Sequence, residues 1–200
     1  MENPKIILVF SGKRKSGKDY LCEKLKCMFK NPTRNNKVQI KLGEDKCCLL
    51  RISEPLKRVY ARDHNLDLEE LLSDGPYKEI HRHNMIKWSE EIREKDPGIF
   101  CKAACDKVSD VPIWIVCDIR RKTDIKWFKE TYGELVKSIR ISADIEVRKD
   151  RGWIFTKDVD DAPSECNLDD FEYWDLQVSN NSSEDSQNAL KKILELVPEY

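Results

Sequence analysis

The sequence lacks the features of a membrane-spanning protein and of a secreted one. No stretch of its 200 residues approaches the roughly 18 consecutive apolar residues of a membrane-spanning helix. Residues 1–11 have a polar start and too short an apolar stretch for a secretory signal, and residues 197–200 are not a peroxisomal Ser-Lys-Leu type ending. We therefore expect a cytosolic protein that binds no membrane, with a peroxisomal location left open.

An excess of charge of one sign is also missing. The 36 Lys and Arg residues against 37 Asp and Glu leave a formal net charge of -1, so no overall field could hold duplex DNA. Any anion must be bound by a local cluster of cations. With 40% hydrophobic and 36% charged residues, a chain of this length predicts one highly charged domain over residues 1–200.

Frameworks for zinc and for disulfides are absent too. The eight cysteines contain no C-x-x-C pair, and the chain has three histidines, His64, His81 and His83. Without a secreted context, reduced thiols that mostly fill the core are expected. No serine or cysteine has a paired base, which argues against a covalent mechanism.

The apolar pattern predicts an α/β protein with a central parallel sheet. Residues 6–10 read IILVF, a continuous apolar run typical of a strand buried on both faces. Further strands are predicted at residues 47–52, 111–117, 135–142 and 173–178. Helices are predicted at residues 19–29, 53–62, around 125–132, at 143–151 and at 184–197. The polar stretch 31–37 predicts a surface loop, and 38–42 a hairpin arm or an insertion.

Two stretches predict regions outside the sheet. Residues 66–108 carry almost no strand signal, so we expect a helical substrate region over about 55–108. Within the helix that starts near Ser53, we interpret Ser53, Glu54 and Pro55 as its cap and first turn. A stretch rich in Asp, Pro and Ser, residues 156–170, predicts a mobile flap, and with its stem we place a lid at about 148–167.

A G-x-x-x-x-G-K motif lies between the first predicted strand and helix, where a phosphate-binding loop requires it. Its backbone N–H groups and the helix start favour an anion, and Lys18 can reach terminal phosphates. We therefore predict a nucleoside triphosphate site that includes the whole loop. Its members are Gly12, Lys13, Arg14, Lys15, Ser16, Gly17, Lys18 and Asp19.

The residue after the loop lysine is unusual. Asp19 stands where Ser or Thr normally binds magnesium. Its carboxylate could bind Mg²⁺ directly or through water, or it could simply be favoured by the helix dipole. Arg14 and Lys15 add charge to the loop and could equally be solvated.

More cations follow the third predicted strand, at the carboxyl edge where open α/β sheets bind ligands. Arg120 and Arg121 could grip a phosphate with their planar guanidinium groups. Asp118 could act on the magnesium hydration shell, or it could cap a helix or pair with an arginine. Arg148 and Arg151, at the stem of the lid, could close over the phosphates or match a helix dipole.

These motifs together resemble the animal-type phosphomevalonate kinase family. The resemblance runs from about residue 6 to residue 197, beginning with the loop and its aspartate at residues 10–19. Shorter matches follow in order at residues 53–57, 77–79, 85–88, 96–98, 118–121, 124–128, 151–153, 160–162 and 164–166. The chain departs from the family's pattern at Lys87, where an Arg is usual, and at Asn181, where a His is usual.

The resemblance implies a P-loop kinase fold of the nucleoside monophosphate kinase type. It implies transfer of the ATP γ-phosphoryl group to mevalonate 5-phosphate, with Mg²⁺, in isoprenoid biosynthesis. Catalytic roles would fall to Lys18, Arg120, Arg121 and Arg151, and further nucleotide contacts to Arg151 and Asn181. Acceptor contacts would fall to Arg120, Arg121, Arg140, Arg148 and Asn180. From their place in the helical substrate region, Lys57, Lys78, Arg82 and Arg93 are further candidates for binding the acceptor, or they could be solvated surface cations. We expect a monomer with small-molecule partners and no nucleic acid.

Two other classes of function remain as alternatives. Another nucleoside monophosphate or small-molecule kinase of the same fold would share the loop and the cations. A nucleic-acid-binding module could use the lysine-rich loop, although the balanced charge disfavours it. A GTPase-like switch would need an Asn-Lys-x-Asp motif after a strand, and the sequence has none.

Overall fold

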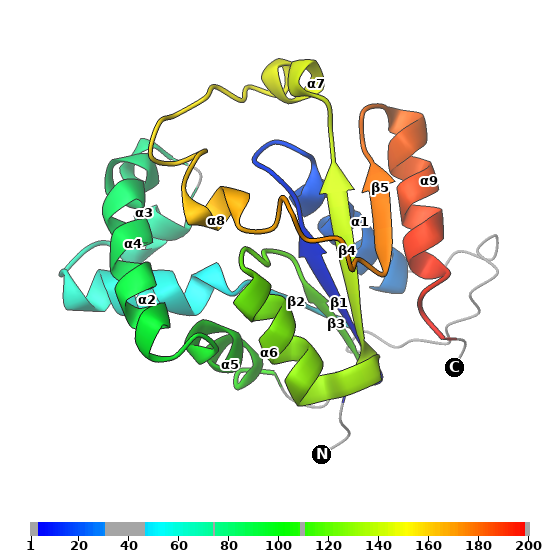
Figure 1. The fold of residues 1–200 in the computed structure, drawn as a ribbon, viewed down its shortest axis with the longest axis horizontal. Coiled ribbons are helices and arrows are strands. Elements are labelled where there is room, and N and C mark those ends of the chain that lie inside the picture. The colour runs from blue at the N-terminus through cyan, green and yellow to red at the C-terminus, as the bar shows by residue number, and fades with distance from the viewer. Residues whose placement is uncertain (1–3, 31–46, 74, 109–110, 199–200) are drawn as a thin grey trace.

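The computed structural model describes residues 4–30, 47–73, 75–108 and 111–198. Within these ranges strands alternate with helices, as Figure 1 shows. The strands are β1 (Ile6–Ser11), β2 (Cys47–Leu50), β3 (Ile113–Val116), β4 (Val136–Ser142) and β5 (Leu176–Ser179). The helices are α1 (Lys18–Lys30), α2 (Ser53–Asp63), α3 (Leu68–Leu72), α4 (Pro76–Lys95), α5 (Ile99–Cys105), α6 (Lys122–Tyr132), α7 (Ile145–Asp150), α8 (Pro163–Cys166) and α9 (Ser183–Leu194), with a 3₁₀ turn at Gly133–Leu135.

The sheet is parallel throughout, and β1 lies at its centre. The strand order is β2-β3-β1-β4-β5. On one side of β1, Ile7 is in register with Trp114 of β3, and on the other Val9 is in register with Ser138 of β4. Every residue of β1 is buried, because helices cover both faces of the sheet. The prediction of a parallel sheet of about five strands is confirmed.

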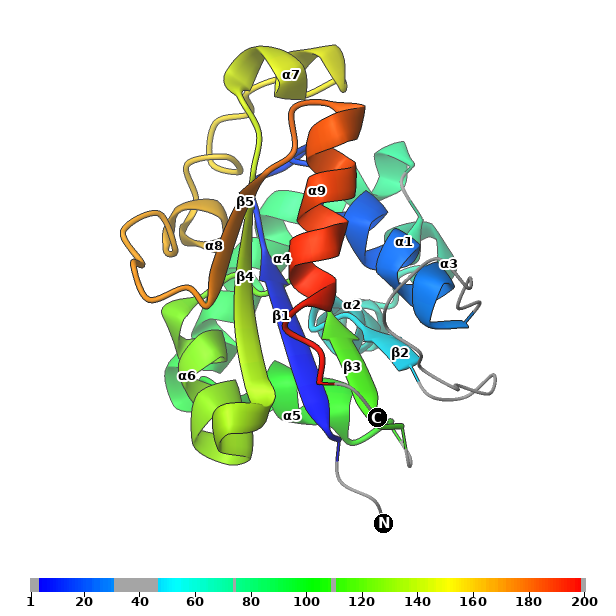
Figure 2. The same cartoon turned by 90° about the vertical axis from the view of Figure 1, so that its right-hand side faces the viewer.

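Helices from different parts of the chain cover the two faces. On one face, Leu21 and Leu25 of α1 and Ile193 of α9 pack with Leu8 in a single apolar cluster. The cluster on the other face includes residues of α5 and α6, among them Phe100 and Phe128. Figures 1 and 2 show α1 and α9 on one side of the sheet and α5 and α6 on the other. This arrangement leaves the carboxyl ends of the strands to loops.

The helical region has a small core of its own. Tyr60 of α2, Leu71 of α3 and Met85 of α4 are buried in one cluster, with Trp88 packed against it. In Figure 1, α8 lies between α4 and β4, so the segment before β5 bridges this region and the sheet. The predicted helices between residues 66 and 108 are present, and no strand is assigned within the described part of that stretch.

The predicted cap of α2 is wrong. Ser53 is the first helical residue, and the preceding Ile52 caps nothing with its side chain. The carboxylate of Asp118 accepts hydrogen bonds from the backbone N–H groups of Ile52 (2.6 Å) and Ser53 (3.0 Å). The first donors of α2 are therefore satisfied by the loop after β3, a contact that local sequence cannot reveal.

The last strand also differs from the prediction. It begins at Leu176 rather than at residue 173. Tyr173 is exposed, and the indole Nε1 of Trp174 donates to the carbonyl oxygen of Phe171 at 2.7 Å, in an irregular segment before the strand. The loop and hairpin arm predicted at residues 31–42 lie outside the described residues.

The eight cysteines form no disulfide. Five of them are buried: Cys22, Cys47, Cys101, Cys105 and Cys117. Among the residues that the structure describes, no three His, Cys, Asp or Glu side chains form a metal-binding group. The described helices include none with the length and apolar character needed to cross a membrane.

Candidate active site

The loop between β1 and α1 is tightly wound. Lys15 and Gly17 have positive φ angles of 62° and 85°. A Cβ atom at Gly17 would lie 2.1 Å from Nδ2 of Asn180, and one at Gly12 would lie 2.6 Å from Oγ of Ser16. Only glycine fits at these two positions. A loop of this shape, placed before a helix, directs backbone N–H groups toward an anion.

The lysine that ends the loop is buried and held across the edge of the sheet. Its Nζ donates to the carbonyl oxygen of Cys117, which follows β3, and to Oδ1 of Asp19 at 2.9 Å. Lys18 thus joins the loop to the segment that carries the arginine pair. A cation held in this way is placed before any ligand arrives.

Asp19 is exposed at the mouth of the loop. Its Oδ1 accepts from Lys18 and from Arg51, whose NH1 lies 3.2 Å away. Burial by itself would raise the pKa of Asp19, but Lys18 and Arg51 together hold it below its usual value. Within the described residues no hydrogen bond reaches Oδ2. A carboxylate oxygen at this place is the hard ligand that Mg²⁺ prefers, so the residue fits a magnesium site.

The lid arginine and the residue after β5 both bind the backbone of the loop. Arg151 donates from NH1 to the carbonyl oxygen of Ser16 (3.1 Å) and from NH2 to that of Asn180 (2.7 Å). Nδ2 of Asn180 donates to the same Ser16 oxygen at 2.8 Å. Asn181 lies farther along, where its Oδ1 accepts from the backbone N–H of Asp144 at 2.8 Å.

Four side chains close a ring between the loop and the lid. Arg14 donates to Oδ2 of Asp160 at 2.9 Å, and Oδ1 of Asp160 accepts from Nε1 of Trp153 at 2.9 Å. The ring of Trp153 lies under the guanidinium group of Arg148, 4.1 Å from its centroid. Nε of Arg148 donates back to the carbonyl oxygen of Arg14 at 2.8 Å. We refer to Arg14, Asp160, Trp153 and Arg148 as the lid ring.

Asp169 links two further predicted cations. Its Oδ2 accepts from Nζ of Lys13 at 2.5 Å, and its Oδ1 accepts from NH2 of Arg140 at 3.0 Å. Arg140 also donates to Oγ of Ser11 at 2.9 Å, which brings it to the start of the loop. The two cations thus lie on one side of the loop, beside the lid.

A separate pocket of about 120 Å³ gathers cations from three elements. Five of the predicted acceptor-binding residues line it: Lys57, Arg82, Arg93, Arg120 and Arg121. Its wall also includes Asp118, Ser89, Ser164, Glu165 and Val159. We refer to it as the acceptor pocket. Burial, with the neighbouring Lys78 and Arg82 adding to it, lowers the pKa of Lys57 to about 8.

Three carboxylates pair with the arginines of this pocket, and two of them, Asp124 and Glu165, are buried. Asp124 is fully buried, and its Oδ2 accepts from the backbone N–H groups of Arg120 and Arg121, both at 3.0 Å. Its Oδ1 accepts from NH1 of Arg93 at 2.5 Å. The side chain of Arg120 pairs with Glu165, and that of Arg121 with Glu90. These partners keep a dense group of cations together in a buried place.

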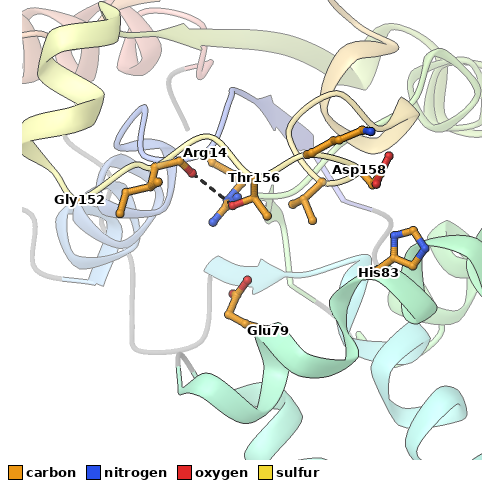
Figure 3. A pocket seen from close by; sticks show the side chains of 9 residues that line it. Arg14, Glu79, His83, Gly152, Thr156 and Asp158 are labelled. Atoms are coloured by element: carbon orange, nitrogen blue, oxygen red, sulfur yellow. Dashed lines mark hydrogen bonds between the residues drawn. The ribbon is translucent and has the colours of Figure 1, made fainter.

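A larger cavity of about 650 Å³ lies between the lid and α4. In Figure 3, Glu79 and His83 of α4 lie on one side of it and Thr156 and Asp158 of the lid on the other. Arg14 of the loop also lines it. Val159 lines both this cavity and the acceptor pocket, so the two spaces adjoin.

Comparison with known proteins identifies the family. A family model described as phosphomevalonate kinase matches residues 10–134. A phosphomevalonate kinase from Drosophila melanogaster is 45% identical over 196 residues, which cover 96% of this chain and 95% of the fly protein. The chain belongs to the phosphomevalonate kinase family. The predictions of this family and of an ATP-dependent kinase function are thereby confirmed.

Solved structures are similar in fold. TT1252 from Thermus thermophilus gives a TM-score of 0.50 at 15% identity, over 98% of this chain and 100% of that one. A gluconokinase from Sinorhizobium meliloti 1021 gives 0.48 at 11% identity, over 97% and 96% of the two chains. With the parallel sheet, the first likeness supports the predicted α/β fold.

Not every predicted site residue of this phosphomevalonate kinase family member lies in one of these groups. Lys15 is exposed at the tip of the loop. Nζ of Lys78 donates to the carbonyl oxygen of Ser73 at 3.0 Å, and Lys78 does not line the acceptor pocket. Asp118 is predicted to act on magnesium through water or to cap a helix. Both of its carboxylate oxygens accept hydrogen bonds from backbone N–H groups at the start of α2.

Sequence reasoning missed the carboxylates that hold the cations. Asp124, Asp160 and Glu165 lie within the short family-like matches, but the sequence predicts no role for them as partners of cations. Their partners Arg120 and Arg14 lie 45 and 146 residues away in the chain. No local spacing could pair them. The one available signal was the near balance of 36 cations by 37 acids, which implies many ion pairs without naming any.

Proposed function

We propose that this enzyme transfers the γ-phosphoryl group of ATP to the phosphate of mevalonate 5-phosphate, giving mevalonate 5-diphosphate and ADP. One observation carries the assignment of groups: five predicted acceptor-binding cations line one pocket beside the carboxyl end of β3. Asp118 lines that pocket and directly follows Cys117, whose carbonyl oxygen accepts from Nζ of Lys18. Cations in these positions would reduce the repulsion between two phosphate groups.

The nucleotide would be held by the loop, Gly12–Asp19, with its phosphates against the backbone N–H groups and Lys18. Arg151 and Asn180 hold the loop in place by donating hydrogen bonds to the carbonyl oxygen of Ser16. The lid ring joins Arg14 of this loop to Asp160 and Arg148 of the lid. We expect these groups to exclude water, which protects the γ-phosphoryl group from hydrolysis.

The acceptor would place its phosphate on Arg120 and Arg121. An oxygen of that phosphate then forms a bond to the γ-phosphorus, while the bond from the γ-phosphorus to the bridging oxygen breaks and ADP leaves with the electron pair. The attacking oxygen is already ionised near neutral pH, since the second phosphate pKa is about 6. No general base is required. The carbon chain of the acceptor would extend into the adjoining cavity beside Val159.

Magnesium, when bound with the nucleotide, neutralises charge on the phosphate oxygens. Asp19 is the residue whose carboxylate fits it, and Asp118 could act only through a water molecule because α2 occupies its oxygens. Monomeric action in the cytosol, the single domain over residues 1–200, the helical substrate region over about 55–108 and the lid over about 148–167 stay predictions.

The test is an assay of ADP release with ATP, magnesium and a panel of acceptors. The panel contains mevalonate 5-phosphate, nucleoside monophosphates and shikimate. We expect rapid turnover with mevalonate 5-phosphate alone and a diphosphate product by ³¹P NMR. Faster turnover with a nucleoside monophosphate or shikimate would assign the enzyme to another kinase activity of the same fold. Strongly salt-dependent binding to DNA or RNA would revive the nucleic-acid alternative.

A further inference from the structure

Two residues that line the acceptor pocket each have a buried side-chain atom without a hydrogen-bond partner in the described part of the chain. Among the described residues, Nε of Arg121 and Oε2 of Glu165 are buried and have no hydrogen-bond partner. Both residues line the acceptor pocket. Nε of Arg121 is a donor and needs an acceptor, whereas Oε2 of Glu165 is an acceptor and needs a donor. Buried polar atoms in native proteins nearly always have partners, which points to groups supplied by a ligand.

Glu165 is held so that only one of its oxygens is used. The residue is 8% exposed and lies in α8, at the end of the lid. Its Oε1 pairs with NH1 of Arg120. The position of Arg120 is fixed independently through its backbone N–H, which donates to Asp124. The second oxygen of Glu165 therefore remains available to a donor beside the arginine pair.

The proposed acceptor offers one suitable group. Mevalonate 5-phosphate carries a phosphate, a carboxylate and a tertiary hydroxyl group. Above the second phosphate pKa of about 6, its phosphate and carboxylate are chiefly hydrogen-bond acceptors, and the hydroxyl is its donor. Two methylene groups separate the hydroxyl-bearing carbon from the phosphate oxygen. This short separation allows the phosphate to bind at Arg120 while the hydroxyl lies at Glu165.

We propose that Oε2 of Glu165 accepts the hydrogen of the acceptor's tertiary hydroxyl group while Nε of Arg121 donates to its phosphate. Glu165 is then a specificity-determining residue, which selects a phosphorylated acceptor that also carries a hydroxyl near the phosphate. This inference rests on the proposed function. The competing explanation is that Glu165 serves only to position Arg120.

The experiment compares two acceptors, mevalonate 5-phosphate and its 3-deoxy analogue, with the wild type and Glu165→Gln. Glutamine keeps the size of the side chain and one oxygen, so it can serve Arg120 or the hydroxyl but not both. The matched control is Asp161→Asn, the same change at an exposed position of the same segment. Thermal unfolding of the three proteins checks that each is folded.

We expect the wild type to prefer the hydroxylated acceptor in kcat/KM by about tenfold to a hundredfold, the range for a hydrogen bond to a charged group. Glu165→Gln should lose most of that preference, mainly by losing activity on the hydroxylated acceptor. Asp161→Asn should keep it.

Equal losses on both acceptors in Glu165→Gln would overturn the inference and assign Glu165 to the positioning of Arg120. A wild type that does not distinguish the two acceptors would overturn it as well, and this comparison holds even if the variant fails to fold. Failure of the proposed function is a separate result, because the wild type would then show no turnover of mevalonate 5-phosphate.

Discussion

The two sides of the site treat their charged side chains differently. On the nucleotide side, Arg14, Arg148 and Arg151 donate to carbonyl oxygens or to Asp160, whose two oxygens are both used. On the acceptor side, Arg121 and Glu165 keep buried atoms of charged side chains without a partner among the described residues, whereas the loop keeps one such atom, the hydroxyl oxygen of the neutral Ser16. The protein thus fixes the geometry around the loop by its own contacts. The acceptor pocket leaves hydrogen-bonding capacity for a ligand to use.

The largest effect is expected where the two sides meet, at Lys18. Lys18→Met should lower kcat by about a hundredfold to a thousandfold, because a fixed cation that stabilises the transferring group is removed. Steady-state assays measure the effect. Lys24→Met, at an exposed lysine of the same helix, is the control and should leave kcat unchanged. Near-normal turnover in Lys18→Met would remove the lysine from the reaction.

Breaking the lid ring tests whether the nucleotide side depends on its own contacts. Asp160→Asn should lower kcat/KM for ATP by about tenfold, since the charge that pairs with Arg14 is lost and one of the side-chain acceptors becomes a donor. The affinity for mevalonate 5-phosphate should change much less. Asp161→Asn is again the matched control. An equal loss for both substrates would contradict a role confined to the nucleotide side.

The metal prediction concerns Asp19. Asp19→Asn should raise the magnesium concentration needed for half-maximal activity by about tenfold, because a charged oxygen ligand becomes a neutral one. Glu23→Gln offers a close comparison, since Glu23 also pairs with Arg51 but lies one turn farther along α1. A magnesium titration at fixed ATP separates them. The same midpoint in both variants would remove Asp19 from the metal site.

The smallest effect sharpens the acceptor side. The pKa of Lys57 is lowered to about 8, so this lysine is mostly charged at pH 7 and mostly neutral at pH 9. The KM for mevalonate 5-phosphate should therefore rise by about fivefold between these pH values, as one phosphate-facing charge is lost. In Lys57→Arg the rise should disappear, because arginine stays protonated. A profile that is unchanged in this variant would assign the titration to another group.

The elements near the sheet could be predicted because each depends on local order along the chain. The apolar run of β1 followed by G-x-x-x-x-G-K predicted strand, loop and helix in the correct places. The helix α2 starts at Ser53, as predicted, but its cap could not be predicted, since Asp118 accepts from its first N–H groups from 65 residues away. The beginning of β5 is predicted too early because Tyr173 and Trp174 have strand-forming side chains but lie in the irregular segment before the strand.

Site residues followed the same rule. The cations were predictable by type, since binding phosphate requires lysine and arginine at the ends of strands and in the loop. The division of these cations between the nucleotide side and the acceptor side could not be predicted, because it depends on which carboxylate pairs with each cation. Lys78 is an example: its place in the helical region predicts an acceptor contact, and that contact stays a prediction, since its Nζ donates to the carbonyl oxygen of Ser73 while its charge acts on Lys57 of the acceptor pocket.

The sequence by itself determined the kind of chemistry, a reaction between anions at a glycine-lined loop, because residue type and spacing along one strand and one helix are local properties. Only the tertiary structure decided which acids neutralise which cations, and it left one oxygen of Glu165 and one nitrogen of Arg121, both residues of the acceptor pocket, without a hydrogen-bond partner among the described residues. The reason is physical: the strength of an ion pair or a hydrogen bond depends on distance and burial, and both arise only when remote segments pack together.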